Sequence, residues 1–208
     1  MKLFDYKLIF IAITTLLCIP IFIPTIYEAL PEVEHEKFVS LGILGKDGLA
    51  ENYYPTADSI IYEDILNKWH IYIHNNFGES TQLLLKIKIL EPNIDPPNIS
   101  TCLPCSGFEV FEIRRVISKN QTITIPFHWM ITDLNEKENS SIISEIQINN
   151  QTRILNISCE NNETIRVVCE LWVFDTNDNK FHFSWIDLEE KRCVWTQIQF
   201  KITILSVI

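Results

Sequence analysis

Cysteines are the residues of this sequence whose types and spacing could do chemistry. Cys102 and Cys105 form a C-x-x-C pair within a stretch rich in proline and serine. Such a pair can be a redox dithiol, half of a zinc site or a short disulfide loop. A zinc site needs four ligands, and no second C-x-x-C or nearby histidine supplies the others. A redox dithiol normally lies where a strand meets a helix in an α/β fold, so the surroundings favour a structural disulfide.

Three more cysteines follow in the second half of the chain, and Cys18 lies in an apolar run near the start. Cys159 and Cys169 flank a short polar segment and could bridge adjacent strands, and Cys193 comes near the end. In an oxidising compartment, exposed cysteines tend to pair. The five cysteines after Cys18 cannot all pair with one another, so at least one is expected to be free or intermolecular. The connectivity is left open.

Other reactive constellations are weak. His70 and His74 have the spacing of helical metal ligands, but on a strand they lie about 13 Å apart, too far to share one ion. Asp187, Glu189 and Glu190 form an acidic cluster that is typical of a solvated turn. No nucleophile elbow, H-E-x-x-H motif or phosphate-binding loop occurs. The sequence therefore predicts no catalytic residue, no metal ligand and no cofactor.

Composition bounds the class of protein. Apolar residues make up 47% of the 208 residues, which is enough to bury a core. The formal net charge of −10 argues against a nucleic-acid partner, because neutralising phosphates requires clustered lysine and arginine.

A hydrophobic run near the amino terminus predicts a membrane helix. Residues 8–26 carry no charge, and this length suits a hydrocarbon core of about 30 Å. Lys2 and Lys7 precede the run, whereas four glutamates follow it between residues 28 and 36. Because cationic flanks stay on the cytoplasmic side, the amino terminus is expected inside the cell. A cleaved signal peptide is the alternative, although it would usually have a shorter apolar core and an A-x-A-like site.

These signals predict four segments. Residues 1–7 form a cytoplasmic tail, residues 8–27 a transmembrane signal anchor, residues 28–37 an acidic stalk, and residues 38–208 an extracytosolic β-sandwich. The expected location is therefore the cell membrane, with a single pass and the carboxy-terminal domain outside.

Apolar residues alternate with polar ones along most of the outer segment, which is typical of half-buried strands. The runs 68–74 and 83–89 flank the sequence Asn75-Asn76-Phe77-Gly78 and predict a hairpin. Residues 123–129 and 165–173 show the same period, with a polar loop expected at 133–139 and a turn at 176–179. A last strand is expected to place Val194, Ile198, Phe200, Ile202 and Ile204 on one side. Many short strands with polar turns predict an all-β, antiparallel β-sandwich.

Glycosylation sequons are dense in the predicted outer segment. Six N-x-S/T sequences occur, none with a central proline, at Asn98, Asn120, Asn139, Asn150, Asn156 and Asn162. Each falls near a predicted loop or strand end, so several are expected to be glycan acceptors if the host has the machinery. The alternative is that an Asn- and Ser/Thr-rich composition produces them by chance.

The start of the outer segment carries the most specific pattern. Leu41-Gly42, Gly45-Lys46 and Tyr54-Pro55 lie in an order that resembles the L-G-x-x-G-K…Y-P-T motif of an uncharacterised, mainly archaeal family of membrane-anchored proteins with a domain of unknown function. The resemblance extends through residues 69–90 and 171–175. An inserted Asp47-Gly48-Leu49 and an extra tyrosine stretch the spacing. The resemblance implies an archaeal envelope location and an immunoglobulin-like sandwich, and it implies no reaction.

Taken from the residues themselves, the same motif is a strand, a Gly-Lys turn and a Tyr-Tyr-Pro corner. A rigid turn packed on the core explains it as well as a binding site does. We therefore interpret the chain as a non-enzymatic, membrane-anchored envelope protein whose sandwich is an interaction or assembly module for a protein partner. An accessory subunit of a larger integral membrane complex is the first alternative. An extracytosolic thiol oxidoreductase using Cys102 and Cys105 is the second.

Overall fold

The computed structural model describes residues 36–56, 58–160 and 163–203, and within them the chain is all-β. Twelve strands occur in this part of the chain: β1 (Phe38–Leu44), β2 (Ile60–Tyr62), β3 (Asn67–Asn76), β4 (Thr81–Leu90), β5 (Phe108–Ile117), β6 (Thr122–Glu136), β7 (Ser140–Ile148), β8 (Gln151–Glu160), β9 (Ile165–Asp175), β10 (Lys180–His182), β11 (Ser184–Asp187) and β12 (Glu190–Thr203).

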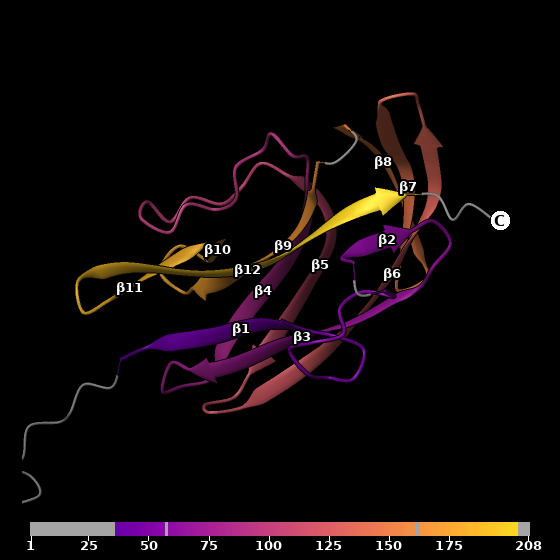
Figure 1. The fold of residues 1–208 in the computed structure, drawn as a ribbon. Helices are drawn as coiled ribbons and strands as arrows, with labels where there is room; N and C mark the ends of the chain where they lie inside the picture. The colour runs from indigo at the N-terminus through magenta and orange to yellow at the C-terminus, as the bar shows by residue number, and fades with distance from the viewer. Residues whose placement is uncertain (1–35, 57, 161–162, 204–208) are drawn as a thin grey trace, which may run out of the picture. The chain divides into compact units, whose positions relative to one another are not determined.

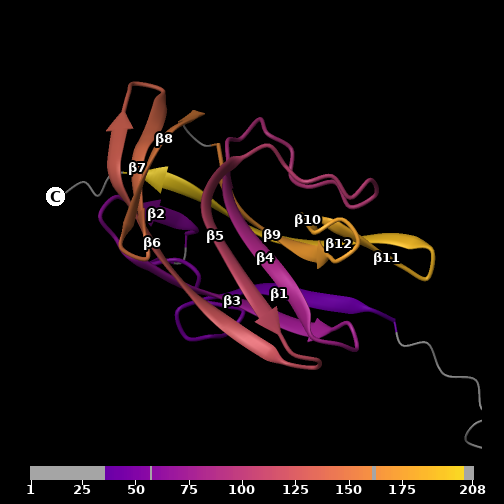
Figure 2. The same ribbon diagram turned by 180° about the vertical axis from the view of Figure 1, so that it is seen from behind.

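The strands form two sheets that pack face to face (Figure 1). The first sheet has the order β1-β3-β6-β7-β8. The second has the order β11-β12-β9-β4-β5, with β10 beside β9 and β2 beside β12. Neighbouring strands are antiparallel except β2 and β12, which run parallel. Figure 2 shows β6 running from the body of the sandwich into the β7–β8 hairpin.

This topology is that of an immunoglobulin-like sandwich. The chain passes from β3 in the first sheet to β4 in the second and returns to the first as β6. It then adds β9 beside β4 and β12 beside β9. The set β1-β3-β6 facing β12-β9-β4 therefore corresponds to strands A-B-E facing G-F-C of immunoglobulin domains. The expectation of a β-sandwich of this class is confirmed.

One apolar core lies between the sheets. Alternate side chains of β3 and β4 are buried in it, as period two requires: Trp69, Ile71 and Ile73 from β3, and Leu83, Leu85, Ile87 and Ile89 from β4. Aromatic rings fill its centre, with the Trp69 and Trp129 centroids 5.1 Å apart at an angle of 70°. Edge-to-face packing of this kind suits the charge distribution of the two rings.

The predicted hairpin over residues 68–89 is wrong. Both strands form, but β3 pairs with β1 and β6, whereas β4 pairs with β5 and β9 in the opposite sheet. Asn75 causes the crossing, because its buried side chain donates to the carbonyls of Glu79 and Ile117 at 2.8 and 2.9 Å and accepts from the Phe77 N–H. These hydrogen bonds hold the connection between β3 and β4 where it crosses from the first sheet to the second.

The predicted polar loop over residues 133–139 is also wrong for most of its length. Strand β6 continues to Glu136, and its pairing with β7 shifts register between Ile131 and Leu134. The irregularity lets Leu134 stay buried while Asp133 faces water, which breaks the alternation read from the sequence. The turn over residues 176–179 and the strands at 165–173 and 194–203 are confirmed, whereas Ile204 of the predicted last strand lies outside the described residues.

The predicted transmembrane helix over residues 8–27 lies outside the described residues. In the part of the chain that the structure describes, no helix has the length and apolar character needed to cross a bilayer.

Candidate binding site

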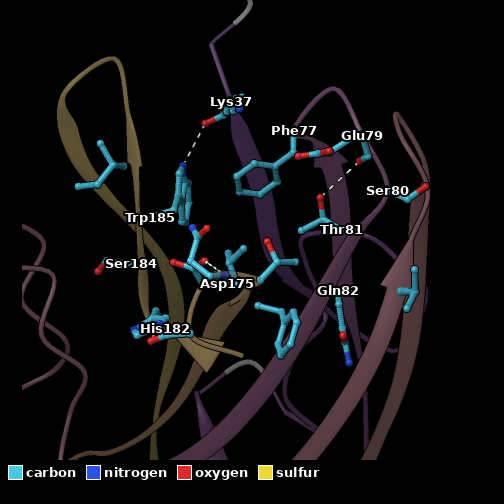
Figure 3. A pocket seen from close by; sticks show the side chains of 17 residues that line it. Lys37, Phe77, Glu79, Ser80, Thr81, Gln82, Asp175, His182, Ser184 and Trp185 are labelled. Atoms are coloured by element: carbon cyan, nitrogen blue, oxygen red, sulfur yellow. Dashed lines mark hydrogen bonds and ion pairs between the residues drawn. The ribbon is translucent and has the colours of Figure 1, made fainter. Parts of the chain in front are cut away.

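A hollow of about 990 Å³ opens at the end of the sandwich where β1 begins. We call it the Trp185 hollow; Figure 3 shows its lining. Five separate stretches of the chain build it: the residue before β1, the β3–β4 connection with the start of β4, the end of β5, the end of β9 with the turn and β10, and β11. Its lining includes Lys37, Phe77, Glu79, Asp175, Asp178, His182 and Trp185.

Two aromatic rings form one wall of the Trp185 hollow. The centroids of Phe77 and Trp185 lie 5.2 Å apart with their planes at 67°. The Trp185 indole N–H donates to the Lys37 carbonyl at 3.2 Å (Figure 3). This bond fixes the ring and also ties the start of the domain to β11. The wall is therefore a pre-ordered apolar surface beside an open space.

Acidic side chains line another part of the hollow. Asp175 and Asp178 shape the β9–β10 turn, because each carboxylate accepts a backbone N–H two residues further on, at 2.8 and 3.1 Å. His182 lies 2.8 Å from Asp178. Although partial desolvation opposes the effect, the hydrogen bond and charge of His182 hold the pKa of Asp178 below its usual range. Asp178 therefore stays ionised into mild acid.

Asp175, Asp178 and His182 also offer ligand atoms that lie within 4.8 Å of one another. Divalent ions accept such oxygen and nitrogen atoms, but protein zinc and calcium sites usually take four or more ligands. Three groups therefore make an incomplete set. The sequence analysis did not single these residues out, since a turn brings them together across two strands.

The family-like motif lies away from the hollow and has a structural role. Gly45 follows β1 in a turn whose backbone approaches so closely that an added Cβ would lie 1.8 Å from the Glu51 carbonyl oxygen. Tyr54 donates its hydroxyl proton to the Gln199 carbonyl at 2.5 Å, and Trp69 donates to the Tyr53 carbonyl at 2.6 Å. These contacts fasten the corner to the core. The strand, the turn and the tyrosine corner are present, and Lys46 and Pro55 line a smaller hollow of about 250 Å³.

The two histidines considered as ligands have different partners. His70 lies 3.2 Å from the Gly45 carbonyl, and His74 lies 2.9 Å from the Thr122 hydroxyl. His70 therefore contacts the turn after β1, whereas His74 contacts its cross-strand neighbour on β6.

A buried ion pair lies under the loop between β4 and β5. The Lys88 ammonium is 2.9 Å from the Glu170 carboxylate, with side chains 9% and 0% exposed. Glu170 also accepts the Cys105 N–H at 2.8 Å and the Trp172 indole N–H at 3.1 Å, and Lys88 donates to the Cys105 carbonyl at 2.6 Å. The ion pair thus holds the second cysteine of the C-x-x-C pair on the outer face of β4 and β9.

The cysteines occupy distinct environments. Cys159 and Cys169 lie on β8 and β9, which belong to opposite sheets, so they are not on adjacent strands. Burial raises the pKa of Cys159 to about 11, with the charges of Glu163 and Glu160 contributing. Burial also raises the pKa of Cys169 far above its usual range. Both thiols are therefore protonated at neutral pH and belong to the apolar core.

Most sequons lie where a glycan could be accommodated. The five described asparagines (98, 120, 139, 150 and 156) are all exposed. Four lie in connections between strands, whereas Asn156 lies on β8 itself. Asn162 lies outside the described residues.

No family model and no curated protein matches the sequence. Among solved structures, the chain is similar to the CARDB domain of the PF1109 protein from Pyrococcus furiosus, crystallised in complex with di-metal ions. The match covers 81% of this chain and 90% of the other, at 8% identity and a TM-score of 0.41.

Proposed function

We propose that the chain is a membrane-anchored, non-enzymatic envelope protein whose sandwich binds a protein partner through the Trp185 hollow. The anchor is the predicted helix at residues 8–27, and the sandwich faces the outside of the cell. The partner is a protein of the membrane or envelope.

The composition of the Trp185 hollow carries this proposal. An ordered aromatic wall lies beside three carboxylates, those of Glu79, Asp175 and Asp178. Aromatic surfaces are favoured at protein interfaces because they bury a large area at low entropic cost. Carboxylates next to them complement a cation. The hollow therefore suits a segment that presents a lysine or arginine next to an apolar side chain.

The position of the hollow supports a role near the membrane. Glu36 and Lys37 are the last two residues of the predicted stalk and belong to the described domain. Arg192 forms an ion pair with Glu36 at 3.2 Å, and Trp185 bonds to the Lys37 carbonyl. The chain segment that leads from the predicted anchor is thus attached to the edge of the hollow.

The thiols support a non-enzymatic role. Burial raises the pKa of Cys105 to about 11, with Glu170 contributing. The attacking thiol of a catalytic dithiol needs the opposite, a lowered pKa that supplies thiolate at neutral pH. Cys105 is therefore protonated at neutral pH and does not supply that attacking thiolate.

Site-specific crosslinking tests the proposed interface. A photoreactive residue replaces Ser80 at the hollow in the full chain, expressed in its native membranes, and a matched control replaces Gln151 on β8. Both positions are exposed, and only Ser80 lines the hollow. We expect a discrete crosslinked protein from Ser80 and none from Gln151. Trp185→Ala should lower the Ser80 yield about tenfold or more, since interface aromatics commonly contribute over 1.4 kcal/mol.

Two outcomes would contradict the proposed interface. Equal crosslinking from Ser80 and Gln151 would show that the hollow is not the contact surface. An undiminished Ser80 yield in both Trp185→Ala and Asp178→Asn would show that neither the aromatic wall nor the acidic lining recognises the partner. Asp178 is exposed, so its substitution leaves the core intact.

Glycosylation tests the outer location independently. In the native host we expect mass heterogeneity on peptides that contain at least two of the six sequon asparagines, because the described ones are exposed. Peptide mass spectrometry before and after enzymatic deglycosylation measures it. Thr152→Ala removes the Asn150 acceptor and should abolish heterogeneity on that site alone. Unmodified masses at every sequon would count against an outer location.

A further inference from the structure

The two cysteines of the C-x-x-C pair face different parts of the second sheet. Cys105 lies against Glu170 and Lys88, on β9 and β4. Cys102 instead lies beside β12: its sulfur is 3.8 Å from the carbonyl of Lys191, and Cys193 comes two residues after Lys191 on the same strand. Cys102 therefore lies next to the part of β12 that carries Cys193, about ninety residues later in the sequence.

The surroundings hold Cys102 in this place. Lys191 donates from its ammonium to the Thr101 carbonyl at 3.1 Å, which fastens the loop to β12 directly beside the two thiols. Within the loop, Asn98 accepts the N–H groups of Ser100 and Thr101 at 2.9 and 3.0 Å and donates its own N–H to the Leu103 carbonyl at 3.0 Å. The loop tip is thus braced internally and docked on β12. Cys102 is itself buried, at 4% exposure.

We propose that Cys102 and Cys193 form a disulfide bridge and that Cys105 remains a free thiol. The bridge fastens the connection between β4 and β5 to the first part of β12. The bridge thus joins the first cysteine of the C-x-x-C motif to a cysteine on a strand that is distant in sequence.

The reaction balances with a small disulfide, such as oxidised glutathione, as the oxidant. One protein thiolate attacks the glutathione disulfide, forms a mixed disulfide and releases one reduced glutathione. The second thiol loses its proton, displaces the other glutathione and closes the protein bridge. Two protein thiols are oxidised, and the two electrons and two protons reside on two glutathione molecules. Burial and the neighbouring Cys102 raise the pKa of Cys193 to about 12.

A local bridge between Cys102 and Cys105 is disfavoured by the same geometry. The Cys105 backbone is fixed at both ends, with its N–H bonded to Glu170 and its carbonyl bonded to Lys88. Its side chain packs in a small apolar cluster with Leu90 and Val168. Turning the thiol toward Cys102 would expose that cluster and disturb the buried ion pair.

Peptide mapping tests the pairing in the full chain. The purified protein is equilibrated with oxidised glutathione, alkylated and digested with trypsin without reduction. Cleavage after Lys88, Arg114, Arg192 and Lys201 places Cys102 and Cys105 on one peptide, residues 89–114, and Cys193 on another, residues 193–201. We expect these two peptides to be linked, with one alkylated cysteine on the first. Cys105→Ser should retain the link, and Cys193→Ser should abolish it.

Two results would overturn the proposal. A peptide 89–114 that is closed on itself, together with alkylated Cys193, would establish the local bridge. Full alkylation of Cys102 and Cys193 after oxidation would show that the pair does not close. Peptide 89–114 contains both Cys102 and Cys105. A link that persists in Cys105→Ser therefore shows that Cys102 is the cysteine bonded to Cys193.

Discussion

Lys88→Met is expected to lower the free energy of unfolding by about 3–5 kcal/mol, because it leaves the buried Glu170 carboxylate without its cation. Glu170 is fully buried, so water cannot replace the lost partner. The same change removes the bond from Lys88 to the Cys105 carbonyl and so releases the loop from β4. Urea titration followed by tryptophan fluorescence measures the loss as a shift of the midpoint.

Lys86→Met is the matched control. Lys86 is two residues away on the same strand and forms ion pairs with Glu109 at 2.7 Å and Glu112 at 3.6 Å. Unlike Lys88 and Glu170, these side chains contact water: Lys86 is 21% exposed, Glu109 39% and Glu112 34%. Exposed pairs typically contribute less than about 1 kcal/mol, so the control should shift the midpoint only slightly. Equal shifts in the two variants would mean that the ion pair under the loop is not buried in solution.

Cys193→Ser is expected to lower the melting temperature of the oxidised protein by roughly 10 °C. A bridge from residue 102 to residue 193 closes a loop of about ninety residues, for which the chain-entropy model gives about 4–5 kcal/mol. For a domain of this size, each kcal/mol corresponds to about 2–4 °C. Thermal melts followed by circular dichroism, with and without a reductant, measure the effect.

The difference between the oxidised and reduced melts is the deciding quantity. It should persist in Cys105→Ser, whose own change affects only the small cluster with Leu90 and Val168. In Cys193→Ser it should vanish. If the reductant shifts the melt of Cys193→Ser as far as that of the native chain, another pair of cysteines supplies the stabilisation.

Strands were the part of the fold that periodicity predicted well. In β3, Trp69, Ile71 and Ile73 are buried, as alternation required, because this strand has one face on the core. In β9, Val167, Cys169 and Leu171 likewise lie in the core, although Val168 and Glu170 on the other face are buried as well. The alternation failed in β6. The register shift near Asp133 interrupts the pattern of alternating buried and exposed side chains, so the sequence of this part of the strand resembled that of a loop.

Alternation reports which face of a strand is buried, but not which strand is its neighbour. Residues 68–89 therefore looked like a hairpin, although β3 and β4 face each other across the core. The feature that distinguishes a crossing between sheets from a hairpin is the buried side chain of Asn75. It donates to three backbone carbonyls, one near the start of β4 and two at the end of β5, which are far apart in sequence. A polar residue in a turn is ordinary, so its sequence context alone carries no such signal.

The candidate site was beyond sequence reasoning for a related reason. The Trp185 hollow combines Lys37, Phe77, Asp175 and Trp185, which no local spacing connects. The cysteine pattern likewise directed attention to Cys102 and Cys105 because they are close in sequence. The structure separates these two by fixing Cys105 on the Lys88–Glu170 pair and by placing Cys102 next to β12.

The parallel contact between β2 and β12 has a consequence for biosynthesis. Ile60 to Tyr62 pair with Lys201 to Thr203, so one of the first strands to be synthesised has its partner in the last. The second sheet is also completed late, since β4 must wait for β9 and β9 for β12. Pairings over such separations close slowly, because the chain loses loop entropy before the contacts form. The nascent domain therefore holds unpaired strand edges until β12 has been synthesised, and these edges can pair with other chains during that interval.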